Sequence, residues 1–157
     1  MSIQQIIQSY PAKSEYLLEM LIAVDQQKKH HYISAEEINE IASYVKVKES
    51  HVCSVMSFYT LLSTQPRGEY VIQVCKDVPC YINDDFNVVL TIEEELGIVL
   101  GQTTNCGRFS LEQTACIGCC DEAPAMRINH EIYTNLTKEK VLDIIHTLRG
   151  DANGRTT

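Results

Sequence analysis

The sequence lacks several patterns that would assign it to common classes of protein. It has no cluster of Lys and Arg, and its formal net charge is −8, so a surface that binds nucleic acid through phosphate contacts is not expected. The longest apolar stretch near the N-terminus, residues 16–24, is interrupted by Glu19 and is too short to span a bilayer. We find no signal peptide, transit peptide or lipidation motif, and we therefore expect a cytoplasmic protein that does not insert into a membrane.

Nucleotide-binding motifs are also missing. No two of the seven glycines lie two positions apart, which excludes Gly-x-Gly-x-x-Gly, and no Gly-x-x-x-x-Gly-Lys-Ser/Thr motif is present. We therefore expect neither a nucleotide site nor a flavin site on this chain.

Cysteine is the most informative residue type that is present. There are seven, and an odd number in a reducing compartment favours metal binding or thiol chemistry over a disulfide framework. Five of them form two loops. Four residues separate Cys75 from Cys80, and three residues, among them Cys119, separate Cys116 from Cys120. Each loop follows a strand-like run, so two strand ends would bring four thiolates to one site.

The first 65 residues have the periodicity of helices. Ser34-Ala-Glu-Glu37 is a capping box that begins one of them. We expect a small helical bundle without catalytic residues, over residues 1–66, that ends at the turn signal in residues 65–68. The expected helices cover residues 16–24, a segment from Ser34 onward and residues 49–61.

From residue 67 the pattern changes period. A β-type run over residues 70–74 leads to Cys75, and a second over residues 109–115 leads to Cys116. The predicted fold is therefore α+β, an N-terminal helical bundle followed by a thioredoxin-like α/β domain over residues 67–150. The other expected segments are a helix over residues 83–96, a hairpin of residues 125–129 and 131–133, a helix from Thr137 to Gly150, and a disordered tail over residues 151–157.

Three kinds of site are compatible with the cysteines. Cys116 and Cys119 have the spacing of a thioredoxin-type redox site, which leaves Cys75, Cys80 and Cys120 without a role. A structural zinc ion needs protein ligands in all four coordination positions, and it favours cysteine pairs that are closer in sequence than these. A [2Fe–2S] cluster needs two thiolates on each of two irons, and the gaps of four and three residues let each loop curve around one iron. The spacing favours the cluster. The alternative with a different kind of function is an interaction module stabilised by zinc, without a redox role.

The same residues resemble a known family. Cys75-x₄-Cys80 is followed, after residues 81–115, by Cys116-Ile-Gly-x-Cys120 and then by Ala-Pro-Ala-Met over residues 123–126. This is similar to the thioredoxin-like [2Fe–2S] ferredoxin family, which includes the 24-kDa-type subunit of respiratory NADH dehydrogenase (complex I) and the small subunits of NAD(P)-linked hydrogenases and formate dehydrogenases. The resemblance covers nearly the whole chain. Further similar segments are Ser57–Tyr59, Tyr70–Cys75, Gly107–Leu111 and Tyr133–Thr137.

The resemblance implies a function in electron transfer. The cluster ligands would be Cys75, Cys80, Cys116 and Cys120, and the chain would be a one-electron-transfer subunit of an oxidoreductase with no catalytic residue of its own. Its partners would be a flavoprotein subunit that binds FMN and NAD(P) and further iron–sulfur subunits. The expected complex is a soluble NAD(P)-linked hydrogenase or formate dehydrogenase, electron-bifurcating forms included. The alternative is the peripheral arm of respiratory NADH:quinone oxidoreductase.

The other cysteines and the histidines receive simpler interpretations. The family has a small residue such as alanine where this chain has Cys119, and we expect this thiol to fill the same space, with ligand exchange as the alternative. Cys53 has the helical spacing of a small buried residue, and Cys106 is expected to be an unpaired loop thiol. The histidines are expected at the surface or at helix caps: His30, His31, His51, His130 and His146.

Overall fold

The computed structural model describes residues 2–150. Contacts divide the chain into two compact units, one ending at Glu69 and the other beginning at Tyr70. No helix within the described residues is both long enough and apolar enough to cross a bilayer. The tail, residues 151–157, lies outside the described residues.

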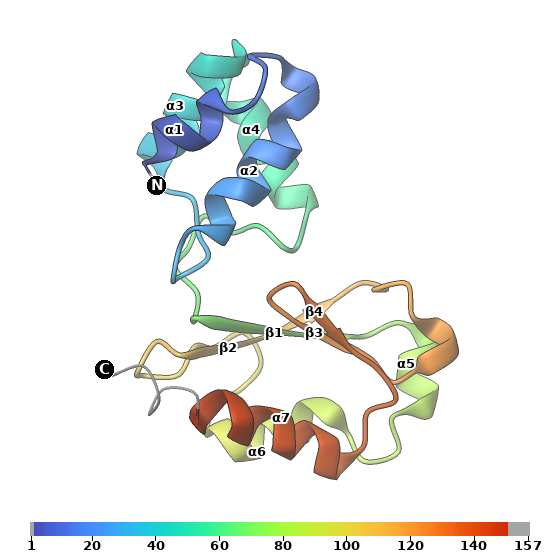
Figure 1. The fold of residues 1–157 in the computed structure, drawn as a ribbon. Coiled ribbons are helices and arrows are strands. Elements are labelled where there is room, and N and C mark those ends of the chain that lie inside the picture. Colours follow the sequence, from blue (N-terminus) through green and yellow to red (C-terminus); the bar gives the residue numbers. More distant parts are fainter. Residues whose placement is uncertain (1, 151–157) are drawn as a thin grey trace. The chain divides into compact units, whose positions relative to one another are not determined.

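The first unit is a bundle of helices (Figure 1). Its core consists of aliphatic side chains that every helix contributes, including Met20, Leu21, Ile41 and Val52, all of which are fully buried. The predicted helices are present, and the chain has a further helix at its N-terminal end. The elements are α1 (Ile3–Gln8), a 3₁₀ turn (Ser14–Tyr16), α2 (Leu17–Gln26), α3 (Ala35–Val45) and α4 (Glu49–Phe58).

The predicted capping box at the start of α3 is confirmed. The amide of Ser34 donates to Glu37 Oε2 at 2.8 Å, and the amide of Glu37 donates to Ser34 Oγ at 3.4 Å. These two bonds satisfy amides that the first turn of a helix leaves without partners. At the other end α3 stops at Lys46, whose left-handed φ of 57° turns the chain toward α4.

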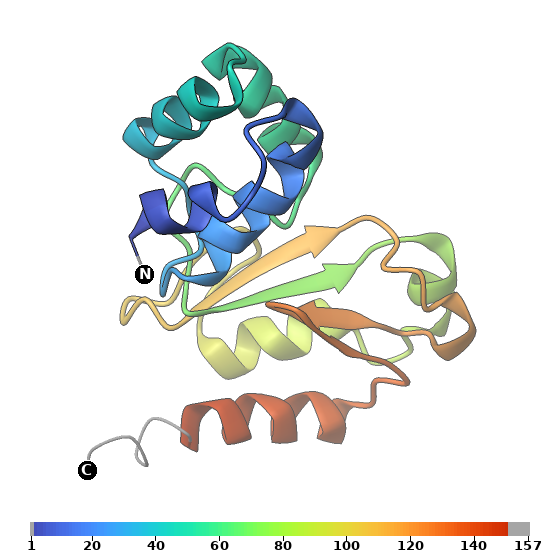
Figure 2. The same cartoon turned by 45° about the horizontal axis from the view of Figure 1, so that its top comes forward.

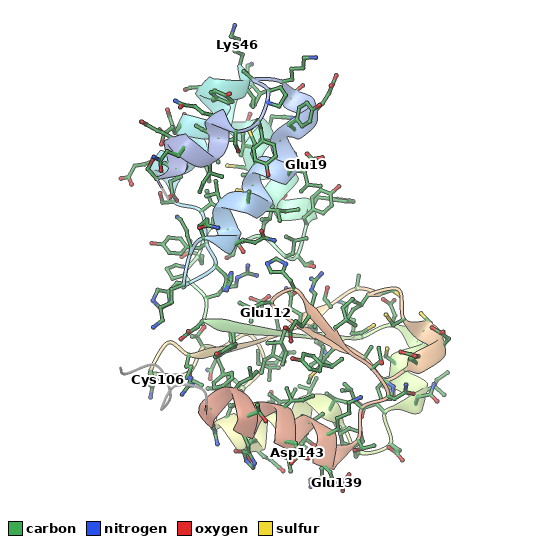
Figure 3. All side chains as sticks on the ribbon, viewed as in Figure 1. Glu19, Lys46, Cys106, Glu112, Glu139 and Asp143 are labelled. Carbon is green, nitrogen blue, oxygen red and sulfur yellow. The ribbon has the colours of Figure 1, made fainter. Side chains whose placement is uncertain are left out.

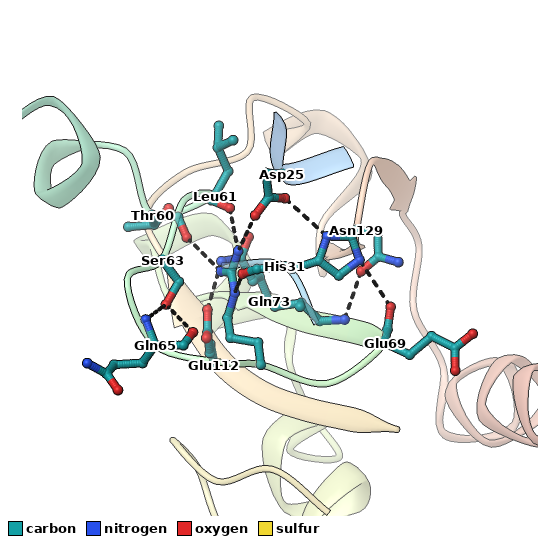
Figure 4. Close-up of polar contacts among 12 residues, drawn as sticks. Asp25, His31, Thr60, Leu61, Ser63, Gln65, Glu69, Gln73, Glu112 and Asn129 are labelled. Carbon is teal, nitrogen blue, oxygen red and sulfur yellow. Dashed lines mark hydrogen bonds and ion pairs between the residues drawn. The ribbon is translucent and has the colours of Figure 1, made fainter. Parts of the chain in front are cut away.

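Two expectations for this unit were wrong. Cys53 is exposed on α4, because its neighbours Val52 and Met56 are the residues that this helix turns toward the core. His31 is buried rather than at the surface. Its Nδ1 lies 3.1 Å from Asp25 Oδ2 and its Nε2 lies 3.2 Å from the carbonyl oxygen of Glu69 (Figure 4).

A buried arginine completes this group of polar residues. Arg67 is 7% exposed and donates from Nε to the His31 carbonyl at 3.0 Å and from Nη2 to the Leu61 carbonyl at 2.6 Å. Its Nη2 also lies 3.7 Å from Asp25 Oδ1, a contact between opposite charges that is too long for a hydrogen bond. Arg67 therefore ties the segment after α4 to the segment that follows α2.

The second unit is built on a four-stranded sheet with the order β2-β1-β3-β4. β1 (Tyr70–Cys75) pairs in parallel with β2 (Phe109–Thr114) and antiparallel with β3 (Met126–Ile128), and β3 pairs antiparallel with β4 (Glu131–Tyr133). In the parallel pair Tyr70 faces Phe109 and Cys75 faces Thr114. The two strands therefore end at the same edge of the sheet, as their arrowheads show in Figure 2.

Two helices cover one side of this sheet, α6 (Val88–Leu96) and α7 (Lys138–Gly150) (Figure 1). They pack against each other and against the strand residues that point toward them. The buried core between helices and sheet includes Ile72, Leu111, Met126, Ile92 and Ile145. The predicted α+β fold is confirmed, with a helical bundle first and a thioredoxin-like unit second.

The helix predicted over residues 83–96 begins too early. The structure has a short helix, α5 (Val78–Asn83), inside the first cysteine loop, followed by a turn and then α6. Asp84 in this turn accepts the amide of Val88 at 2.9 Å, and Asn87 has a left-handed φ of 58° and accepts the amide of Leu90. These side chains cap α6 instead of extending it, because Asp and Asn compete for backbone amides at helix starts.

Candidate metal centre

The first cysteine pair is held by regular secondary structure. Cys75 is the last residue of β1, and its amide donates to the carbonyl of Ala125 at 3.2 Å. Cys80 lies on α5, which accommodates Pro79 because an amide in the first turn needs no partner within the helix. Both cysteines are buried, at 7% and 4% exposure. They form a small apolar cluster with Ala125.

The second pair lies on an irregular loop. Cys116 and Cys120 are both exposed, and their sulfur atoms lie 3.3 Å apart. The amide of Gly118 donates to Cys116 Sγ at 3.3 Å. Gly118 adopts a φ of +96°, a conformation that L-residues avoid, so glycine is required for this turn of the loop.

Both loops leave the sheet at the same edge. The amide of Lys76 donates to the carbonyl of Thr114 at 3.1 Å, immediately beyond the paired residues of β1 and β2. The second loop ends in a 3₁₀ turn (Cys120–Glu122), whose last carbonyl accepts the amide of Asn135 at 2.7 Å. The parallel pairing of β1 and β2 therefore sets the two cysteine loops beside each other, as the sequence predicted.

The thiols perturb one another across the two loops. Burial raises the pKa of Cys80 to about 11, and the hydrogen bond with Cys75 and the nearby charges of Cys75 and Cys120 add to this, whereas the amide of Ala125 opposes it. The pKa of Cys120 is also raised, first by its hydrogen bond with Cys116 and then by partial burial and the charges of Cys116, Cys75 and Asp77. Each thiol disfavours ionisation of its neighbours because the charges have the same sign.

The four thiols of the two loops fit a group that contains metal ions. Cysteine binds metals as the thiolate, and a coordinated metal ion deprotonates a thiol that is otherwise held neutral. The four thiols form two pairs, Cys75 with Cys80 and Cys116 with Cys120, which is the arrangement that two irons of one cluster require. Within residues 2–150, no three His, Cys, Asp or Glu side chains surround one point as ligands of a single metal ion.

Some features of this centre were not predicted from the sequence. α5 itself was missed, because its six residues are too few for a periodic signal. Ala125 was noted only as part of a motif, yet its carbonyl and its amide contact Cys75 and Cys80 respectively. Cys106, in contrast, is a free thiol in an exposed loop before β2, as predicted. It lies at the opposite end of the sheet from α5 (Figures 1 and 3).

A comparison of the chain with known proteins agrees with this geometry. The model of the thioredoxin-like [2Fe–2S] ferredoxin family matches residues 3–149, and the chain belongs to this family. It is similar to a subunit of the NADH-quinone oxidoreductase of Buchnera aphidicola subsp. Baizongia pistaciae (strain Bp), with 32% identity over 142 residues, which cover 90% of this chain and 82% of that protein.

A hydrogenase subunit is similarly related. The NADP-reducing hydrogenase subunit HndA of Solidesulfovibrio fructosivorans is 33% identical over 141 residues, which cover 90% of this chain and 81% of that protein. Among solved structures, an NAD⁺-reducing [NiFe]-hydrogenase in the air-oxidized state has a TM-score of 0.75 at 21% identity. The match covers 89% of this chain but only 24% of that longer one, and at this identity it supports the fold alone.

Proposed function

We propose that this chain is a one-electron-transfer subunit that holds a [2Fe–2S] cluster on Cys75, Cys80, Cys116 and Cys120. The observation that carries the proposal is the meeting of two cysteine pairs at the ends of two parallel strands. A cluster of this kind, when bound, accepts and releases one electron at a time. The chain contributes four thiolates and the amides of Gly118 and Ala125, which donate hydrogen bonds to cysteine sulfur.

Hydrogen bonds and burial are the two means by which the protein sets the reduction potential of such a group. Amide donors stabilise negative charge on sulfur and therefore favour the reduced state. The buried pair, Cys75 and Cys80, would keep water from one side of the cluster, whereas the exposed pair, Cys116 and Cys120, would leave its other side open to solvent.

The partner that fits this role is a flavoprotein subunit. A one-electron carrier cannot accept a hydride from a nicotinamide, and flavin chemistry separates the two electrons. We propose an NAD(P)-linked hydrogenase or formate dehydrogenase as the complex, electron-bifurcating forms included, with the FMN and NAD(P) on the partner. The relative named as an NADP-reducing hydrogenase subunit supports this choice. We place the complex in the cytoplasm, because reduced thiols persist there.

A second candidate is the peripheral arm of NADH:quinone oxidoreductase. Several relatives of similar identity are named as a subunit of NADH-quinone oxidoreductase, including those of two Rickettsia species. Both candidates need the same electron-transfer subunit and differ in what accepts the electrons. In neither case does this chain act as a catalyst alone.

The face by which the partner docks is suggested by α5. Val78, Tyr81 and Ile82 share one side of this helix and are 65%, 79% and 71% exposed, directly beside the buried Cys80. Exposed apolar groups of this size next to a redox site are typical of an interface core. Acidic residues flank α5 in the sequence and follow Cys120 in the second cysteine loop, so a partner with an apolar patch and a basic rim would be complementary. These acidic residues are Asp77, Asp84, Asp85, Asp121 and Glu122.

The cluster is tested by purifying the chain without oxygen and measuring iron, acid-labile sulfide and the EPR spectrum after dithionite reduction. We expect about two irons and two sulfides per chain and a rhombic S = ½ signal. Cys75→Ala and Cys116→Ala should each lose the signal, whereas Cys53→Ala, on the other unit, should keep it. One zinc ion without sulfide would refute the electron-transfer role and leave a structural module.

The docking face is tested separately in the native host. Tyr81→Glu in a tagged chain should abolish copurification of an FMN-carrying subunit, measured by flavin fluorescence, while the iron content stays unchanged. Ile132→Glu is the matched control, because Ile132 is also exposed, at 48%, but lies on β4. Equal flavin recovery with both variants would show that the partner does not dock on α5.

A further inference from the structure

The metal centre contains a fifth thiol that the proposed ligand set does not use. Cys119 lies between Gly118 and Cys120 on the exposed loop, yet it is itself half-buried. It packs against the apolar cluster that Cys75 and Cys80 form with Ala125. Of the three cysteines outside the ligand set, Cys53 and Cys106 are exposed and away from this cluster, so Cys119 alone among these three contacts it.

The loop that carries Cys119 is fixed at its ends and irregular in between. It begins after Thr114, where the carbonyl accepts the amide of Lys76, and it ends at Glu122, where the carbonyl accepts the amide of Asn135. Between these points Gly118 has its left-handed φ, and a Cβ built on it would meet no atom within 4 Å. Open space therefore lies beside Gly118, the residue that precedes Cys119 in the loop.

The spacing of the loop permits two chelating pairs. Cys116 and Cys120 enclose three residues, and Cys116 and Cys119 enclose two. Cysteines separated by two to four residues chelate one metal ion in proteins, so both pairs are within the observed range. Cys119 is in no disulfide, which leaves its sulfur available as a ligand.

We propose that Cys119 is a reserve ligand that replaces Cys120 on the metal ion bound by this loop. The proposal rests on the cluster assigned above. In the exchange one iron–sulfur bond forms to Cys119 and one breaks at Cys120. The proton of the Cys119 thiol goes to water, the Cys120 thiolate takes up a proton from water, and no electron is transferred. The metal ion keeps two thiolates from the loop throughout.

Cys120 is the ligand to be replaced for a geometric reason. Cys75 and Cys80 are fixed by β1 and α5. Cys119 could replace one of them only if the second loop moved and gave up its own pair of ligands, Cys116 and Cys120. Cys120 is exposed, is adjacent to Cys119 in sequence and begins a 3₁₀ turn, so it is the ligand of this loop that Cys119 can most directly replace.

The test compares four forms of the full chain, purified without oxygen: wild type, Cys119→Ala, Cys120→Ala and the double variant. Alanine is used because a serine hydroxyl can itself act as a ligand. We expect Cys119→Ala to hold as much iron and sulfide as wild type, and Cys120→Ala to hold more than about half. The double variant should hold at least about tenfold less than wild type, because the loop then offers a single thiolate.

Three other outcomes are informative. Equal loss in Cys120→Ala and in the double variant would overturn the reserve role, and loss in Cys119→Ala alone would make Cys119 an ordinary ligand. Absence of iron and sulfide from wild type would instead overturn the cluster itself. Circular dichroism of each variant without metal checks folding, and Cys120→Gly with its own Cys119→Ala partner repeats the comparison if the alanine variant unfolds.

Discussion

The buried polar group in the helical unit permits a quantitative prediction. Asp25 is 3% exposed, and its carboxylate lies 3.1 Å from His31 Nδ1 (Figure 4) and 3.7 Å from Arg67 Nη2. Asp25→Ala leaves both basic side chains buried without their carboxylate. Removing one partner of a buried ion pair costs about 3–5 kcal/mol, so the free energy of unfolding of this unit should fall by about 4 kcal/mol.

Urea unfolding measures this loss. The chain has eight tyrosines and no tryptophan, so helix content by circular dichroism is the better signal for the helical unit. With an m-value of about 1–2 kcal/mol/M for a unit of this size, the midpoint should fall by about 2 M or more. The stability of such a small unit is itself only several kcal/mol, so Asp25→Ala should leave a measurable unfolded fraction without urea.

Lys29→Ala is the matched control. Lys29 lies 3.5 Å from Glu69 in an exposed ion pair of the same unit, with the lysine side chain 67% accessible. Exposed pairs contribute about 0–1 kcal/mol, so this variant should unfold near the wild-type midpoint. If Asp25→Ala shifted the midpoint no more than Lys29→Ala, the buried group would not stabilise the unit and the reasoning would be wrong.

Three further predictions concern single groups of the second unit. The hydrogen bond between Cys106 Sγ and Thr104 Oγ1, together with the amide of Arg108, lowers the pKa of Cys106, so Cys106 should react with iodoacetamide near neutral pH faster than a peptide thiol, and Thr104→Ala should slow it. Burial and the Glu131 carboxylate raise the pKa of Tyr133 to about 12. The stability from this phenol is complete below its unfolded pKa of about 10 and is lost as pH rises through 12, which an ultraviolet titration of wild type against Tyr133→Phe resolves. Gly118→Ala forces an L-residue into a φ of +96°, at a cost of about 1–3 kcal/mol, and should speed iron loss to a chelator.

The sequence was most informative where a pattern is local. The capping box at Ser34 and the strand that ends at Cys75 depend on neighbouring residues, and both are present as predicted. The spacing of the cysteines, combined with two strands that end side by side, was enough to predict which loops meet.

Features that depend on tertiary contacts were missed. His31 has no local signal for burial, since its partners are Asp25, six residues earlier, and the carbonyl of Glu69, far along the chain. The helix predicted from residue 83 failed because Asp84 and Asn87 cap α6 with their side chains, which apolar periodicity does not register. α5 was missed because one turn and a half of helix, with a proline in it, has the composition of a loop.

The register of the sheet has a consequence for chemistry. Side chains alternate between the two faces of a strand, so a shift of β1 by one residue against β2 and β3 would turn Cys75 to the opposite face. In the observed register, Cys75 of β1 pairs with Thr114 of β2, and Val74 of β1 pairs with Met126 of β3. With the proposed ligand set, the hydrogen bonds that hold β1 in this register would also decide whether Cys75 can coordinate iron, and a substitution deep in the sheet would then abolish electron transfer without changing a single cysteine.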